Sequence, residues 1–197
     1  RYLPAAKLSK LKSSTASNPQ CEYARKLFLF SYYCYGISFI DMAMLTAAHI
    51  KQMEDGDYIV YKRQKIKRQK GVKPISIKIT PAIRQLIGSL QAASPTVDDF
   101  LLPIVTRSGY TGERLYMHIR TRYSKYQKYL RLLAEELGID FHLTSYVSRH
   151  TAAMTLQRNN IPREVISQML GHADLETTNI YLDSFDNRVI NEAAKVL

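Results

Sequence analysis

Residues 170–181 read LGHADLETTNIY, and the organisation of the whole chain follows from this stretch. Its leucine ends an apolar-periodic run, and Gly171 then predicts the end of a helix, because glycine adopts the left-handed conformation at low cost. Asp174 is placed to cap a following helix. His172 is therefore expected in a sharp turn, with the hydroxyl of Tyr181 two helical turns further along on the same side. The two side chains can then share one substrate atom, although both residue types also serve as packing residues at helix ends.

The balance of charge indicates a nucleic-acid partner. The chain has 197 residues, with 28 Lys and Arg against 17 Asp and Glu and a net charge of +11. A basic surface also suits membranes or acidic proteins, but no apolar run approaches the roughly 20 residues of a membrane span and no secretion leader opens the chain. We expect a soluble cytoplasmic protein with one sizeable core. Cys21 and Cys34 do not make a disulfide framework and lack the further Cys and His neighbours of a zinc site, so we expect both to be reduced and structural in a cytosolic setting.

Hydrophobic periodicity predicts a mainly α fold with a small antiparallel β-sheet, an α+β arrangement. Period-two alternation over residues 50–79, with a turn at Asp55-Gly56, predicts the strands. Ser38 is a candidate N-cap, and Asp41 three residues later completes something close to a capping box. Helices are expected over residues 21–35, 38–45, 81–92, 113–137 and 162–170, and in a segment that opens at Thr144 or Ser145.

A cluster of cations lies between the second and third predicted strands. Lysines protect sheet edges from aggregation, so a basic hairpin can be simply a solvated edge. Seven cations in twelve residues exceed that need, and we expect a hairpin that reaches into a DNA groove and contacts phosphates. The cations are Lys62, Arg63, Lys65, Lys67, Arg68, Lys70 and Lys73.

The long helix expected over residues 113–137 interleaves basic and aromatic side chains. This pattern suits a surface that tracks a nucleic-acid backbone, with Arg120 and Arg122 in contact with DNA. A charged outer face with tyrosines packed beneath it is an equally good interpretation.

The segment LTSYVSRHTAA at residues 143–153 places functional groups near the start of another helix. Tyr146 and Arg149 share one helix face, so a hydroxyl and a guanidinium are expected to converge. No carboxylate lies three or four residues from Arg149. A phosphate is its natural partner, because the guanidinium fork matches two phosphate oxygens.

Taken in order, these pieces resemble the catalytic domain of the tyrosine recombinases, or phage integrases. The resemblance rests on the lysine-bearing hairpin, TSYVSRHT at 144–151, LGH at 170–172 and TTNIY at 177–181, and it covers about residues 21–196. FLFSYYCYGISFIDMAML at 28–45 and LTSYVSRHTAA resemble most closely the integrases of conjugative and mobilisable transposons of Bacteroides-type bacteria.

The resemblance implies the roles of several residues. Tyr181 is expected to be the nucleophile, His172 the histidine of the third family motif, and Arg149 the second family arginine. Lys65 best matches the hairpin lysine, with Lys67 and Lys70 remaining open. His150 is expected either near DNA or in packing.

Two positions depart from the family pattern. Ser38 stands where the family keeps its first arginine, three residues before an acidic residue, and the transposon branch resembles this chain in having serine there. Arg63 is a candidate to supply the missing cation. Tyr146 stands where the family keeps the first histidine of its H-x-x-R motif.

The expected chemistry explains these residue types. A phenol with an unperturbed pKa near 10 attacks a phosphodiester at neutral pH only if cations favour phenolate and stabilise the transition state. The product is a 3′-phosphotyrosyl link, formed without metal, ATP or cofactor, with Lys65 as general acid to the 5′ oxygen. A two-metal nuclease is disfavoured, because adjacent pairs such as Asp98-Asp99 point in different directions. A catalytically silent DNA-binding domain and a topoisomerase-like enzyme are the alternatives.

The expected domain order is a linker over residues 1–20 from a preceding DNA-binding domain, a catalytic domain over 21–185, and a C-terminal helix over 186–197. In the family that helix commonly docks on a neighbouring protomer, so we expect a homotetramer on double-stranded DNA sites and a monomer or weak oligomer when free. Accessory DNA-bending factors are further candidate partners.

Overall fold

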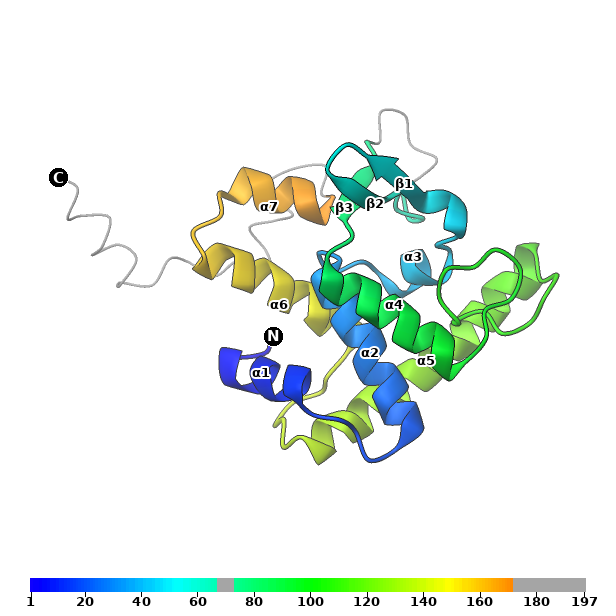
Figure 1. The fold of residues 1–197 in the computed structure, drawn as a ribbon. Coiled ribbons are helices and arrows are strands. Elements are labelled where there is room, and N and C mark those ends of the chain that lie inside the picture. Colours follow the sequence, from blue (N-terminus) through cyan, green and yellow to red (C-terminus); the bar gives the residue numbers. More distant parts are fainter. Residues whose placement is uncertain (67–72, 172–197) are drawn as a thin grey trace.

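Residues 1–66 and 73–171 are described by the computed structural model, in which helices surround a small sheet (Figure 1). His172, Tyr181 and the hairpin residues Lys67, Arg68 and Lys70 lie outside the described residues. The mainly α fold with a small antiparallel sheet is confirmed. The elements are α1 (Ala5–Ser13), α2 (Pro19–Tyr33), α3 (Phe39–Ala43), a short 3₁₀ helix η1 (Ala47–His49), β1 (Ile50–Met53), β2 (Gly56–Tyr61), β3 (Ile75–Lys78), α4 (Pro81–Ala93), α5 (Gly112–Glu136), α6 (Ser145–Arg158) and α7 (Arg163–Leu170).

The helix ends follow the local chemistry of the sequence. The Ser38 side chain accepts from the N–H of Asp41, which confirms it as the N-cap of α3. Asn18 caps α2 in the same way and Pro19 follows at the first helical position. Gly171 ends α7 with φ of +64°, the left-handed conformation expected of it.

The sheet has the order β1-β2-β3, and both pairs are antiparallel. The turn at Asp55-Gly56 is confirmed, since Met53 pairs with Gly56 across it. Ile59 and Ile77 pair with each other and are both fully buried. One face of the sheet thus closes over the core, and β3 also contacts α7.

Helix α2 is the centre of the helical part. It packs against α4, α5 and α6, and Figure 1 shows it running between them. Leu27, Phe28 and Phe30 are completely buried, because apolar residues recur around most of the helix. α2 therefore sets where α6, the helix of Arg149, lies relative to α5.

The N-terminal segment contains a helix that the sequence did not predict. Leu8 and Leu11 of α1 are buried, and the N–H of Leu3 donates to Oγ1 of Thr151 on α6 over 3.0 Å. Lys10 Nζ donates to the carbonyl of Leu137, just after α5. Residues 3–11 are therefore packed onto the helices that follow them.

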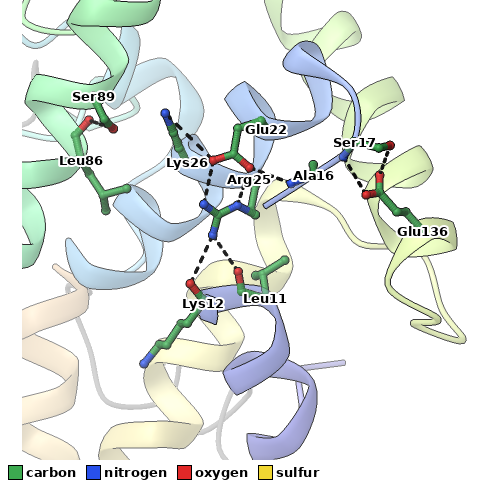
Figure 2. Close-up of polar contacts among 10 residues, drawn as sticks. All are labelled: Leu11, Lys12, Ala16, Ser17, Glu22, Arg25, Lys26, Leu86, Ser89 and Glu136. Atoms are coloured by element: carbon green, nitrogen blue, oxygen red, sulfur yellow. Dashed lines mark hydrogen bonds and ion pairs between the residues drawn. The ribbon is translucent and has the colours of Figure 1, made fainter. Parts of the chain in front are cut away.

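An ion pair on α2, between the buried Arg25 and the half-buried Glu22, also holds α1 in place (Figure 2). Arg25 and Glu22 form two N–H···O bonds of 2.7 Å, and the same guanidinium donates to the carbonyl of Leu11 over 2.8 Å. Glu136 at the end of α5 accepts from the N–H of Ser17 over 2.8 Å. Charge-assisted bonds of this kind are stronger than neutral ones.

Candidate active site

Arg149 lies on α6 with only 5% of its surface exposed. Its Nη1 donates to the carbonyl of Gly36 over 3.2 Å, and its Nη2 donates to the carbonyl of Leu170 over 2.5 Å. Main-chain acceptors from the turn after α2 and from the end of α7 therefore hold one guanidinium in place.

Gly36 brings its turn directly against α6. Its φ is +71°, and a Cβ on it would lie 2.4 Å from the Cα of Arg149 and 2.5 Å from its Cβ. No other residue fits at that distance. This contact places the arginine.

Arg63 reaches the same place from the loop after β2. Its Nη1 donates to the carbonyl of Gly171 over 3.2 Å. A Cβ on Gly171 would lie 2.4 Å from Cδ1 of Ile75 on β3, so the end of α7 lies directly against the sheet. Arg149 and Arg63 thus donate to the carbonyls of two consecutive residues, Leu170 and Gly171, immediately before His172 in the chain.

A buried carboxylate connects Ser38 to the Arg63 loop. Oγ of Ser38 donates to Oδ2 of Asp41 over 2.6 Å, and Oδ1 of Asp41 accepts from the N–H of Gln64 over 2.7 Å. Asp41 is only 3% exposed. Sequence reasoning gave Asp41 a capping role alone, because the bond to Gln64 joins residues far apart in the chain.

Tyr61 also carries a phenol near Asp41, Arg149 and Arg63, but its side chain is buried. Burial raises its pKa, and the Asp41 carboxylate raises it further, whereas Arg149 and Arg63 act in the opposite direction. Its hydroxyl therefore stays protonated near neutral pH, which is unfavourable for a nucleophile.

A pocket of about 430 Å³ opens beside the two arginines. It lies between the starts of α3 and α6 and the first half of α5, and Ser38, Arg63, Arg120, Tyr123, Tyr146 and Arg149 are among the residues that line it. Tyr146 is 53% exposed. Its ring lies edge-on to the His150 imidazole, with 4.9 Å between the two ring centroids. Tyr146 and Arg149, which were expected to converge on one site, both line this pocket.

Arg120 and Arg122, the two arginines of α5 that were expected to contact DNA, lie on opposite sides of that helix. A separation of two residues corresponds to a rotation of about 200° around the helix axis. Arg120 lines the pocket. Arg122 is half-buried elsewhere, with Nε donating to the carbonyl of Ile104 over 3.1 Å. Beneath the helix Tyr126 is buried, whereas Tyr116 and Tyr123 are exposed. The buried Tyr126 agrees with tyrosines packed beneath a charged outer face, and the contact of Arg120 and Arg122 with DNA stays a prediction.

Three of the other expected cations are among the described residues. Lys62, Lys65 and Lys73 are exposed at the two ends of the gap between β2 and β3. Within residues 1–66 and 73–171, no group of three or more His, Cys, Asp or Glu side chains is close enough together to hold a metal ion. None of the helices in the described part of the chain is both long and apolar enough to cross a membrane.

A pair of buried serines behind Arg149 was not anticipated. The hydroxyls of Ser31 on α2 and Ser148 on α6 are 2.7 Å apart. Ser31 also donates to the carbonyl of Ile37, next to Gly36. This network joins α2, α6 and the Gly36 turn. The sequence gives no signal for it, because a serine within a helix does not indicate its partner on another helix.

Comparison with known proteins establishes the family. The model described as the phage integrase family matches residues 1–188, and the chain belongs to this family. Tyrosine recombinase XerD of Brucella abortus biovar 1 is 30% identical over 119 residues, which are 59% of this chain and 35% of that protein. XerD of Halalkalibacterium halodurans is 43% identical over 54 residues, 27% of this chain and 18% of that one. The chain thus matches about a third or less of each relative's length.

Solved structures agree with the fold. The XerA recombinase crystal structure superposes with a TM-score of 0.66 at 22% identity, covering 99% of this chain and 64% of that one. The Tn1549 transposon integrase with a circular intermediate DNA gives 0.67 at 11% identity, covering 100% and 66%. The tyrosine recombinase catalytic-domain fold is therefore confirmed.

Proposed function

We propose that this chain contains the DNA-cleaving and rejoining domain of a site-specific recombinase that integrates or excises a mobile element. The main support is the placement of Arg149 and Arg63, which donate to consecutive carbonyls immediately before His172. Two guanidiniums from separate elements are thereby available to one phosphate, and we propose that the His172 imidazole joins them. Tyr181 follows nine residues later in the chain.

In the proposed reaction the phenolate oxygen of Tyr181 attacks the scissile phosphorus. The bond from phosphorus to the 5′ oxygen breaks, a 3′-phosphotyrosyl link forms, and the leaving oxygen takes a proton from Lys65. Arg149, Arg63 and His172 stabilise the negative charge on the phosphate in the transition state. The phosphoester energy is kept in the link, so a second strand can reverse the step without ATP.

The proposed partners follow from the same chemistry. Double-stranded recombination sites are the substrate, with the exposed Lys62, Lys65 and Lys73 and the hairpin between them contacting phosphates. We also propose a tetramer on paired sites, with residues 186–197 docking on a neighbouring protomer, in the bacterial cytoplasm at the nucleoid. Accessory bending factors complete the assembly.

One observation favours a second function, a DNA-binding domain without cleavage activity. The Ser38 hydroxyl, at the position of the first family arginine, donates to Asp41 and carries no charge. Arg63 then has to supply the missing guanidinium, beside Arg149 at the end of α7.

A nicked suicide substrate made from the ends of the element distinguishes the two functions. Wild type is expected to form a covalent protein–DNA adduct in EDTA that survives denaturing electrophoresis. Tyr181→Phe should bind the same DNA and form no adduct. Binding without any adduct in wild type would assign the silent function, and an adduct that requires magnesium would contradict the mechanism.

A further inference from the structure

Three water-exposed tyrosines surround the candidate active-site pocket. Tyr116 is 59% exposed, Tyr146 53% and Tyr123 37%, and all three line the pocket. Among the described residues they are half of the six large hydrophobic side chains that are exposed. Apolar groups gathered at one exposed place mark a surface that binds something, and flat rings are suited to a ligand with a flat apolar face.

The pocket is also strongly cationic. Arg63, Arg120 and Arg149 line it, and no Asp or Glu is among its lining residues. Within the described residues neither Arg63 nor Arg120 forms an ion pair with a carboxylate. A ligand that carries both an aromatic face and a negative charge complements this lining.

The volume of the pocket indicates which kind of ligand it can bind. At about 430 Å³ it falls within the range of roughly 300–1,000 Å³ typical of sites that enclose a small ligand. A phosphate on an intact duplex lies on a convex backbone, and the faces of its paired bases are covered by their neighbours. A phosphate alone therefore complements the arginines and does not account for the exposed tyrosine rings.

We propose that this pocket binds an unstacked nucleobase of the DNA, beside the phosphate held by Arg149 and Arg63. The inference rests on the proposed function and names the form in which that site takes its substrate. Tyr116 and Tyr123 supply exposed rings for stacking, and Arg120 adds a cation to the same lining. Aromatic and basic side chains combined in this way are the usual means of binding bases outside a duplex, without base-pair readout.

This proposal predicts a preference for DNA in which one base is already free. Removing a base from the stack costs free energy, and the cost is smallest at an unpaired position. The protein should therefore bind a duplex with a single bulged base more tightly than the same duplex fully paired. Stacking on a tyrosine should also change the fluorescence of the bulged base.

The experiment uses the full chain and two short duplexes, each with one 2-aminopurine, either bulged or paired. We expect wild type to bind the bulged duplex about tenfold more tightly and to quench its fluorescence. Tyr116→Ala should lose most of that preference, and Tyr116→Phe should keep it, because stacking uses the ring and not the hydroxyl. Tyr129→Ala, on α5 but outside this pocket, is the matched control, and thermal melting checks that each variant is folded.

Equal affinity of wild type for the two duplexes would overturn the proposal, as would a preference that Tyr116→Ala retains. If only Tyr181→Ala prefers the bulged duplex, Tyr181 itself occupies the pocket in wild type. That outcome would also overturn the proposal. Adduct formation on paired DNA is measured separately. An adduct without base preference removes this inference alone, and base preference without an adduct removes the proposed cleavage alone.

Discussion

Gly36 and Arg149 lie so close together that a single added methyl group on the glycine would overlap the backbone of the arginine. The Cβ of an alanine at position 36 would be 2.4 Å from the Cα of Arg149, and the Gly36 carbonyl accepts from the same residue's guanidinium. These contacts therefore fix the distance between the turn after α2 and the start of α6.

Gly36→Ala is expected to destabilise the fold by about 3 kcal/mol and to reduce adduct formation strongly, since both strain and overlap act at this position. Urea denaturation measures the first effect and the suicide-substrate assay the second. Gly109→Ala is the matched control, because its φ is +72° and nothing lies within 4 Å of an added Cβ. It should cost only about 1 kcal/mol. Equal losses at the two sites would mean that the contact with Arg149 has no effect.

Arg63→Ala is expected to lower the rate of adduct formation about 100-fold, the usual effect of removing one donor to a transition-state charge. Ser38→Arg in the same chain should restore part of that rate, because Ser38 lines the same pocket and an arginine there returns the cation. Arg84→Ala is the control, since that arginine pairs with Asp57 on the surface. If Arg63→Ala cleaves at the wild-type rate, the arginine does not supply the missing charge.

Asp41→Ala is expected to slow cleavage while leaving DNA affinity within a few fold. The carboxylate touches no expected substrate position, but it holds the N–H of Gln64, next to Arg63. Asp41→Asn should recover most of the rate, because its amide oxygen still accepts from Gln64. Asp57→Ala removes the half-buried carboxylate that pairs with Arg84 at the surface and should change neither quantity. A parallel loss of affinity and rate in Asp41→Ala would point to general unfolding of the loop.

Arg25→Ala is expected to cost about 3 kcal/mol, because it leaves the Glu22 carboxylate half-buried without its main partner. Lys26→Ala, whose Nζ is 4.0 Å from the same carboxylate, should cost under about 1 kcal/mol. Chemical denaturation at neutral pH measures both.

The Arg25–Glu22 pair makes the stability of the fold depend on pH, and the direction of this dependence follows from the pKa of Glu22. Burial alone raises the pKa of Glu22, but the bonds from Arg25 and the Ala16 N–H, with the charges of Arg25 and Lys26, lower it overall. A lowered pKa in the folded state stabilises the fold above the unfolded pKa, and this stability is lost as pH falls through the folded pKa. Wild type should therefore lose more stability than Arg25→Ala on acidification below pH 4.5, the ordinary pKa of the group. Parallel curves would exclude this contribution.

Sequence patterns predicted much of the fold because its helices start and stop at local signals. Gly171 and the Ser38 cap lie where their residue types indicate. The first long helix was placed two residues late, at Cys21, although Asn18-Pro19 is itself a start signal. Helix α1 was not predicted, because its burial depends on Leu8 and Leu11 meeting helices that come later in the chain.

The candidate site was predictable only where neighbours in sequence are neighbours in space. Tyr146 and Arg149 share a helix face, and the structure places both at the pocket. The bonds of Asp41 to Gln64 and of Ser31 to Ser148 join separate elements, so no local pattern carries them.

Helix α1 sets where the folded unit begins. A domain shortened to start at Pro19 would strip Arg25 of a main-chain acceptor and remove the Leu3 N–H from Thr151, two residues beyond Arg149. A pull applied at the amino end would accordingly reach the helix of that arginine through the bonds of Leu3 to Thr151 and of Arg158 to Tyr2. Trimming these first residues to obtain a smaller protein would thus disturb the very helix whose chemistry one wished to isolate.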